Sequence, residues 1–279
     1  LYLLPDLGGK LVSLRRREGN NVLLSPPDFP HRVAPYGASF EDYDTSGFDE
    51  CFPTVAACPS PDDPSIQWPD HGELWSVPWE TEFDGVRIRQ TVHGTQWPYR
   101  FRRTLRIEGD TLHLEYEVIS LHAERPLTAL WSAHPLLAAK PGGRIRLPAE
   151  VRSLHIEGSS HLQGTQVPWP SEGLVLADAC RFSKLFTDRL AEGWAAYEDE
   201  KKTVLFRFDP RKTPFLGLWL CEGGWPTSRP SKHFTVALEP CSAPGDSLFS
   251  LFAAKNRALR LLPGIPETWS LSLSLPPRG

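Results

Sequence analysis

The sequence predicts an all-β fold in which two twisted sheets pack against each other as a sandwich. Apolar and polar residues alternate along several stretches, most clearly in 111–119, where Leu112, Leu114, Tyr116 and Val118 share one face. The 28 prolines and 21 glycines are spread along the whole chain, which favours short elements joined by turns. Strands do not alternate regularly with helices, and this argues against doubly wound and barrel α/β folds.

Further strands are predicted by the same period of two. They cover residues 86–92, 101–107, 203–209 and 271–275. The segment EGD at 108–110 predicts a tight hairpin turn in which Gly109 adopts a positive φ. Helical signals are few, and only 184–191 and 247–255 are expected to form short helical turns.

The chain is expected to form a single domain over residues 1–279. Sandwiches and barrels often reach this length as one unit, and no linker rich in glycine and serine divides the chain. The proline-rich stretch 53–69 is interpreted as a long loop within the domain, and loops of that length are usually functional.

Composition excludes several classes of partner. Hydrophobic residues make up 40% and charged residues 23%, as in ordinary soluble globular proteins. With a net charge of −4 and no long basic run, neither a nucleic-acid partner nor a membrane partner is expected. Five scattered cysteines without a CxxC pair favour a reduced, cytoplasmic setting, although one or two disulfides remain compatible with them. We expect a monomer or a homodimer.

Three polar residues stand in contexts that strand packing does not require. His71 lies in a turn, PDHGELW, and is either a site residue or a surface histidine. His134 follows an apolar strand and precedes Pro135, and a partly desolvated imidazole there can donate a proton near neutral pH. Glu239 ends the apolar segment FTVALEP and is a candidate base, because an unpartnered carboxylate there costs free energy. The alternatives are a core histidine at 134 and a solvated glutamate at 239.

The order of these motifs resembles the aldose 1-epimerase, or galactose mutarotase, superfamily. Residues 97–138, from WPYRF to HPLLA, are similar to the central segment of that family. The His71-Gly72 pair resembles its upstream loop histidine, and LEP at 238–240 resembles its late Glu-Pro motif. Residues 8–24 are similar to its first hairpin and 262–275 to its closing strand. The resemblance implies a galactose-mutarotase-like twisted β-sandwich with few short helices.

The resemblance also implies an isomerase mechanism on a monosaccharide or related sugar. His134 would protonate the ring oxygen as general acid, and Glu239 would take the proton of the C1 hydroxyl as general base. The ring would open to the aldehyde and close again as the other anomer, while His71 would hydrogen-bond the ring or a neighbouring hydroxyl. This chemistry needs no metal and no organic cofactor.

Several positions depart from the family pattern. Leu136 follows the His-Pro pair where an aromatic residue is usual, and Asp49 and Glu50 lie where a sugar-gripping arginine is usual. Lys184 lies near the position of a late aspartate that has no clear counterpart. These departures point to another sugar, or to a carbohydrate-binding protein of the same fold without turnover.

Aromatic residues are expected to line the sugar-binding groove, because sugar C–H faces stack on aromatic rings. Trp225 lies on a predicted turn, and Trp219 precedes it on a strand where core packing is the alternative. Trp75 lies near His71. The predicted substrate-binding residues are therefore Asp49, Glu50, Trp75, Lys184, Trp219 and Trp225.

Other enzyme classes have weaker support. A glycosidase would need two suitably spaced carboxylates, which Asp49, Glu50 and Glu239 could supply. A sugar phosphate is not favoured, because strand alternation sends Arg102 and Arg103 to opposite faces. The sequence contains no G-x-S-x-G nucleophile elbow, no P-loop and no G-x-G-x-x-G motif.

Overall fold

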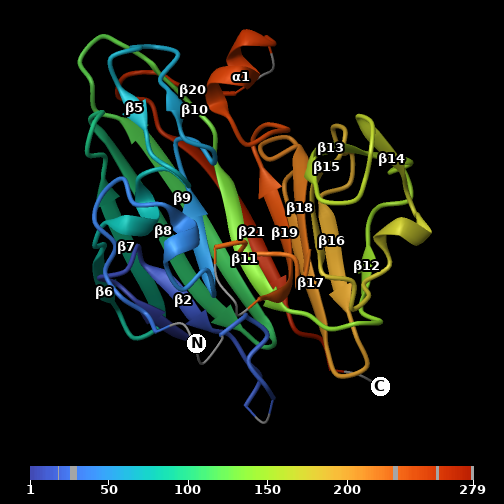
Figure 1. Cartoon of the computed structure of the whole chain (residues 1–279). Helices are drawn as coiled ribbons and strands as arrows, with labels where there is room; N and C mark the ends of the chain where they lie inside the picture. Colours follow the sequence, from blue (N-terminus) through green and yellow to red (C-terminus); the bar gives the residue numbers. More distant parts are fainter. Residues whose placement is uncertain (18, 26–29, 229–231, 256–257, 278–279) are drawn as a thin grey trace.

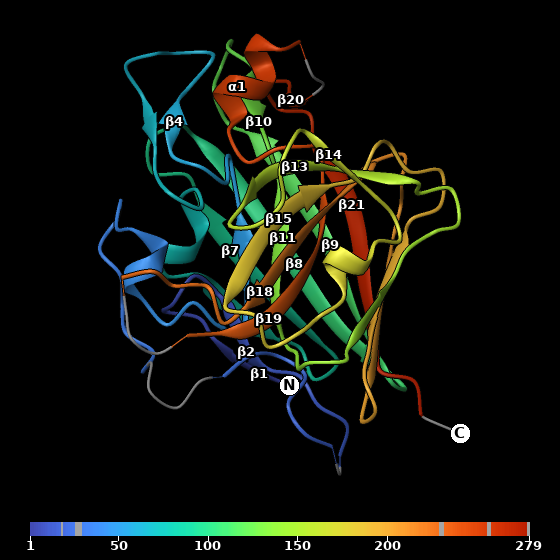
Figure 2. The same cartoon turned by 45° about the vertical axis from the view of Figure 1, so that its right-hand side comes forward.

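Two large antiparallel sheets pack face to face in the computed structural model of the chain (Figures 1 and 2). The structure describes residues 1–17, 19–25, 30–228, 232–255 and 258–277. The predicted all-β sandwich is confirmed, because strands form both layers and helices are few and short.

The first sheet carries the segments that the sequence singled out for function. In spatial order its strands are β1 (Tyr2–Leu4), β2 (Lys10–Ser13), β3 (Phe48–Cys51), β11 (Ser132–Ala138), β19 (Phe234–Cys241), β18 (Phe215–Glu222), β15 (Arg181–Phe186), β13 (Ser153–Ser159) and β14 (Gln166–Pro168). Strands far apart in the sequence, such as β3, β11 and β19, are neighbours in this sheet, so its middle is assembled by long-range pairing.

The second sheet is built mainly of long hairpins. Its strands are β12 (Arg144–Arg146), β16 (Trp194–Glu198), β17 (Thr203–Phe208), β21 (Glu267–Ser274), β9 (Thr111–Ser120), β8 (Tyr99–Glu108), β7 (Arg87–His93) and β6 (Glu80–Phe83). The predicted hairpin joins β8 to β9, with Glu108 opposite Thr111 and Gly109 at φ 58°. All four apolar residues that alternate in 111–119 are buried between the sheets, as predicted.

Short elements cover the ends and edges of the sandwich. They are the hairpins β4 (Cys58–Pro59) with β5 (Gln67–Trp68) and β10 (Leu127–Ala129) with β20 (Leu259–Leu261), the helix α1 (Leu248–Ala253), and the 3-10 turns η1 (Phe40–Asp42), η2 (Leu74–Ser76) and η3 (Glu172–Leu174). Figures 1 and 2 show α1 beside the β10–β20 hairpin at one end of the molecule, with the N-terminus towards the other.

The helix predicted over 184–191 is wrong. Residues up to Phe186 belong to β15, which pairs with β13 on one side and β18 on the other. Pairing on both sides buries these side chains and overrides a weak local helical pattern. The second predicted helix is confirmed as α1, where the Ser247 hydroxyl accepts the backbone N–H of Ser250 as an N-cap. The proline-rich stretch 53–69 is irregular apart from the short β4–β5 hairpin.

A buried ion pair joins the two sheets inside the core. The Arg103 guanidinium donates to Glu50 Oε1 at 2.7 Å, and neither side chain has any exposed surface. Tyr116 Oη and Trp131 Nε1 also donate to the Glu50 carboxylate, each at 2.9 Å. Arg102 instead lies on the outer face beside Glu117, as the alternation predicted. The charge of Glu50 is therefore satisfied between the layers.

The described residues contain no helix with both the length and the apolar character needed to cross a membrane. All five cysteines are free thiols. Four of them are buried, and only Cys180 is exposed.

Candidate functional site

A row of polar side chains crosses the middle of the first sheet. Strand β3 pairs with β11 so that Asp49 lies opposite His134, and the register of β11 with β19 brings Glu239 to the other side of His134. Gly217 on β18 lies opposite Glu239. Directly paired residues point to the same face of a sheet, so the side chains of Asp49, His134 and Glu239 share one face. His134 and Glu239 lie within their strands rather than at the strand ends that the sequence predicted.

A cavity of about 170 Å³ lies on this face. Strands β11, β15 and β18 supply its floor, and the loops around η1 and ahead of η2 supply its rim. Five of the residues predicted for the site line it, namely His71, His134, Lys184, Trp219 and Trp225, together with Phe40, Val55, Leu136 and Asp246. The volume lies below the range of about 300–1,000 Å³ of pockets for drug-sized ligands, so the cavity suits one small molecule.

Glu239 is fully buried and does not line the cavity, but it contacts two residues that do, His134 and Lys184. Its Oε1 is 3.8 Å from His134 Nε2, and its Oε2 accepts a hydrogen bond from the Lys184 ammonium. Gly217 makes room for this arrangement, because an added Cβ would come within 2.9 Å of Glu239 Oε2. Glu239 Oε1 and His134 Nδ1 are both buried without a hydrogen-bond partner, and such atoms cost free energy unless a ligand or water satisfies them.

Lys184 forms ion pairs with two carboxylates at the cavity. Its ammonium lies between Glu239 and Asp246, with Asp246 Oδ1 at 3.5 Å. Burial alone would lower the pKa of Lys184, but Asp246 and Glu239 outweigh burial and raise it. Lys184 is therefore a cation at neutral pH, held between two carboxylates.

Burial shifts the titrating groups of the site in opposite directions. It lowers the pKa of the His134 imidazole well below its usual value, and the neighbouring charges of His71 and Lys184 act in the same direction. Burial raises the pKa of the Glu239 carboxyl, although Lys184 opposes this shift. It also raises the pKa of Asp49 to about 6, against the effect of Lys10. Shifts of this kind, caused by burial beside specific charges in a cleft, are common at functional sites.

His71 enters the site from a strained turn. Its backbone has φ 59°, an uncommon conformation for a side-chain-bearing residue, and its N–H donates to the Val55 carbonyl at 2.6 Å. Gly72 follows at φ 73°, where a Cβ would lie 2.2 Å from the Phe52 carbonyl oxygen. The imidazole stacks on Phe40 with ring centroids 4.0 Å apart and meets His134 edge-on at 5.0 Å. The turn thus fixes the ring beside His134.

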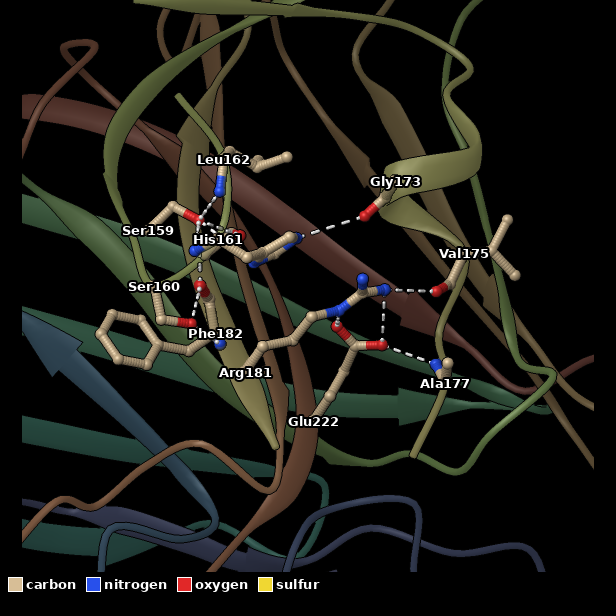
Figure 3. Close-up of polar contacts among 11 residues, drawn as sticks. Ser159, Ser160, His161, Leu162, Gly173, Val175, Ala177, Arg181, Phe182 and Glu222 are labelled. Atoms are coloured by element: carbon tan, nitrogen blue, oxygen red, sulfur yellow. Dashed lines mark hydrogen bonds and ion pairs between the residues drawn. The ribbon is translucent and has the colours of Figure 1, made fainter. Parts of the chain in front are cut away.

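Aromatic rings form the opposite wall of the cavity. Trp219 and Trp225 meet edge to face at 5.7 Å, and Phe182 packs against the other side of Trp219 at 5.4 Å. Figure 3 shows the polar contacts that hold this end of the sheet together. The Arg181 guanidinium binds the nearly buried Glu222 carboxylate at 2.6 Å, which ties the ends of β15 and β18 to each other.

Solved structures with the same architecture are known from several organisms. The Slr1438 protein of Synechocystis sp. PCC 6803 is similar over 98% of this chain and 90% of that one, with a TM-score of 0.73 and 16% identity. A galactose mutarotase-like protein of Clostridium acetobutylicum is similar over 99% and 92%, with a TM-score of 0.70 and 14% identity. A GalM/aldose epimerase homologue from C. elegans is similar over 98% of this chain and 94% of that one, with a TM-score of 0.60 and 13% identity. The chain has the galactose mutarotase fold.

At the level of sequence, the comparisons return nothing. No protein-family model matches the chain, and no curated protein matches it. The likeness to galactose mutarotase-like structures is therefore one of fold at low identity, and the chemistry of the site must be argued from its own residues.

Within the galactose mutarotase fold, three predicted binding residues do not reach the cavity. Asp49 lies behind the wall, where its Oδ2 is 2.9 Å from the Lys10 ammonium. Trp75 lies behind Phe40, edge to face at 5.1 Å, and donates its indole N–H to the Asp70 carbonyl. The prediction that Glu50 binds the substrate is wrong. It follows Asp49 on β3, so its side chain points to the other face and into the core.

Four residues that were not predicted for the site also line the cavity, and two of them, Phe40 and Asp246, contribute an aromatic ring and a carboxylate. Phe40 lies on η1, where its backbone N–H donates to Asp70 Oδ2 at 2.8 Å. Asp246 precedes α1, and its Oδ1 is buried without a hydrogen-bond partner. Neither residue lies in a periodic pattern. The proline-glycine pair before Asp246 marks a loop, and this was the one feature of the sequence that could have drawn attention to Asp246.

The site does not resemble a metal centre. Among the described residues, no group of three or more histidine, cysteine, aspartate or glutamate side chains is arranged to hold a metal ion. The polar groups that face the cavity are two imidazoles, one ammonium and one carboxylate, which suit hydrogen bonding to hydroxyl groups and proton transfer.

Proposed function

We propose that this protein is a carbohydrate-binding isomerase that interconverts the anomers of a free aldose or related sugar. The observation that carries the proposal is the approach of His134 Nε2 to Glu239 Oε1, 3.8 Å apart, at the floor of a cavity with an aromatic wall. A proton donor and a proton acceptor on one side of a small cavity are the groups that opening a sugar ring requires.

In the proposed reaction the protonated form of His134, which its lowered pKa makes the minor species near neutral pH, gives a proton to the ring oxygen while the bond between that oxygen and C1 breaks. Glu239 takes the proton of the C1 hydroxyl, and the C1 carbonyl forms. Rotation about the C1–C2 bond presents the other face of the aldehyde. The same two groups then work in reverse, since the glutamic acid returns its proton and the imidazole recovers one. The sugar therefore gains one proton and loses one in each direction.

The other cavity residues bind and orient the sugar in this proposal. Trp219 and Trp225 offer aromatic surface to the C–H face of the ring. Asp246 Oδ1, which is buried and forms an ion pair with Lys184 but no hydrogen bond to the described residues, accepts a hydroxyl hydrogen, and His71 hydrogen-bonds the ring or a neighbouring hydroxyl. Lys184 opposes the effect of burial on Glu239 and so favours the ionised carboxylate that a base requires.

The test is exchange NMR at the anomeric carbon across a panel of free aldoses. We expect acceleration with at least one sugar, and losses of about a hundredfold to ten-thousandfold in Glu239→Gln and in His134→Gln. His113→Gln is the matched control, because His113 lies on the outer half-exposed face of β9 in the other sheet. Full rates in both site variants would refute the assignment of acid and base.

A second candidate function is carbohydrate binding without turnover. One observation favours it: Glu239 has no exposed surface, and Lys184 occupies its Oε2. Calorimetry separates the two candidates. A sugar that binds with normal stoichiometry while its anomers exchange no faster than in buffer would favour a binding protein.

A further inference from the structure

A second and larger cavity lies at the other end of strand β11. It has a volume of about 330 Å³, and its walls come from both sheets. Ala138 closes β11, Thr203 begins β17, and Leu275 follows β21. Figures 1 and 2 show the β16–β17 connection and the end of β21 at the end of the sandwich opposite α1. The volume falls in the range of small-molecule pockets.

Cations from separate segments converge on this cavity. Arg16 comes from the N-terminal hairpin, Lys140 from the segment after β11, and Lys201 and Lys202 from the β16–β17 turn. Among the described residues that line this cavity, Asp199 is the only carboxylate. This concentration of positive charge occurs in a chain whose net charge is −4, so it is not an average property of the surface.

The one carboxylate is already occupied by local donors. Asp199 Oδ1 accepts the backbone N–H of Lys201 at 2.7 Å and of Lys202 at 3.1 Å, and Oδ2 accepts the Tyr197 hydroxyl at 3.1 Å. These contacts hold the turn in place. Asp199 thus stabilises the turn that presents the two lysines, and it does not neutralise them by a direct ion pair.

Lys202 is more buried than Lys201 and has no carboxylate partner among the described residues. Its ammonium donates to the carbonyl of Ala138, which brings the charge to the end of β11. Burial lowers the pKa of Lys202, although Asp199 opposes the shift, as expected of a cation that no direct anion compensates. At the rim, Arg16 pairs with Asp110 and Lys140 with Glu200, and both carboxylates are exposed, so these pairs contribute little.

Much of the remaining wall is apolar, beside the polar side chains of Asn20, Asn21 and Thr203. Val22, Ala138, Ala139, Leu275 and Pro276 line the cavity between the cations. Inorganic phosphate would leave this surface uncovered, whereas a neutral apolar molecule would leave the cations unpaired. A ligand with one anionic group and an apolar body satisfies both parts of the wall.

We propose that this cavity binds a small organic acid, with its carboxylate or sulfonate at Lys201 and Lys202 and its apolar body against Val22, Ala138 and Leu275. The site is separate from the sugar cavity. Ala138 lies four residues beyond His134 on the same strand, which is about 13 Å along an extended chain. The proposal therefore stands or falls independently of the isomerase activity.

The experiment titrates benzoate, as a simple aromatic acid, into the whole protein and follows the methyl NMR signals of alanine, leucine and valine. Signals of Val22, Ala138 and Leu275 should shift and saturate. Leu136 should not shift, because it lines the sugar cavity on the same strand. Benzamide, which is neutral and similar in shape, should bind about tenfold more weakly or worse.

Two matched variants complete the test. Lys202→Gln should weaken benzoate binding about tenfold or more, because it removes the inner charge and keeps most of the stem. Lys212→Gln makes the same change at a remote, half-exposed ion pair and should leave the affinity unchanged. The proposal is overturned if benzoate shifts none of the three methyl groups, if benzamide or phosphate binds as tightly, or if Lys202→Gln binds like the parent protein.

Discussion

Removing the guanidinium of Arg103 should destabilise the fold far more than removing an exposed one. Arg103 and Glu50 are fully buried between the sheets and are 2.7 Å apart. Arg103 also donates to the Gly9 carbonyl at 2.5 Å and to Gln90 Oε1 at 2.6 Å. In Arg103→Met the methionine fills much of the volume, but the carboxylate of Glu50 remains in the core with no cation.

The magnitude follows from the cost of an unpaired buried charge. Breaking a buried ion pair by removing one partner costs about 3–5 kcal/mol of unfolding free energy. At about 2 °C per kcal/mol, the low end for a chain of this size, the melting temperature should fall by roughly 6–10 °C. Tyr116 and Trp131 still donate to Glu50, so the carboxylate keeps two hydrogen bonds and the loss stays within this range.

The assay is urea and thermal unfolding followed by tryptophan fluorescence and circular dichroism. Arg89→Met is the matched control, because Arg89 pairs with Glu82 on the outer face at 3.3 Å and both side chains are well exposed. Exposed pairs contribute about 0–1 kcal/mol. Adding Glu50→Gln to Arg103→Met should recover part of the loss, because the second change removes the orphaned charge.

The reasoning fails if Arg103→Met costs no more than Arg89→Met, or if Glu50→Gln destabilises the Arg103→Met protein as much as it destabilises the parent. Either result would mean that the buried charges are not coupled. The same variants test the placement of Glu50 in the core: at temperatures where Glu50→Gln is folded, its affinity for a sugar should equal that of the parent.

Two further predictions concern the proposed active site. The rate of anomer exchange should be bell-shaped in pH, because protonation of Glu239, whose pKa burial raises, removes the base at low pH, and deprotonation of His134, whose pKa burial lowers, removes the acid as the pH rises. A rate that does not change with pH contradicts this. Gly217→Ala should slow exchange about tenfold or more in a folded protein. The new Cβ would lie 2.9 Å from Glu239 Oε2, which is too close, so the carboxylate would have to move. Gly158→Ala on β13, where an added Cβ meets nothing within 4 Å, is its control, and equal rates in the two variants would show that Glu239 has room to move.

The sequence was informative wherever a local pattern was enough. Alternation along 111–119 predicted which side chains are buried, and EGD at 108–110 predicted the hairpin with its positive φ at Gly109. The opposite directions of Arg102 and Arg103 also followed from the period of two.

Predictions failed where long-range pairing decided the outcome. Lys184 lies in a segment with a weak helical pattern, and only pairing with β13 and β18 makes that segment a strand. Asp49 and Glu50 were both predicted for the groove, although adjacent residues of a strand point to opposite faces. Which of the two faces the core depends on how β3 meets β2 and β11.

The sequence by itself determined the class of fold and indicated His71, His134 and Glu239 as candidate catalytic residues. It could not determine that His134 and Glu239 are neighbours, because 105 positions along the chain separate them and their approach depends on the register of β11 with β19. It also could not reveal that Lys184 and Asp246 join them, or that four cations meet at a second cavity. Those contacts arise between segments distant in the chain, and a local pattern specifies which face a side chain takes but not which strand lies beside it.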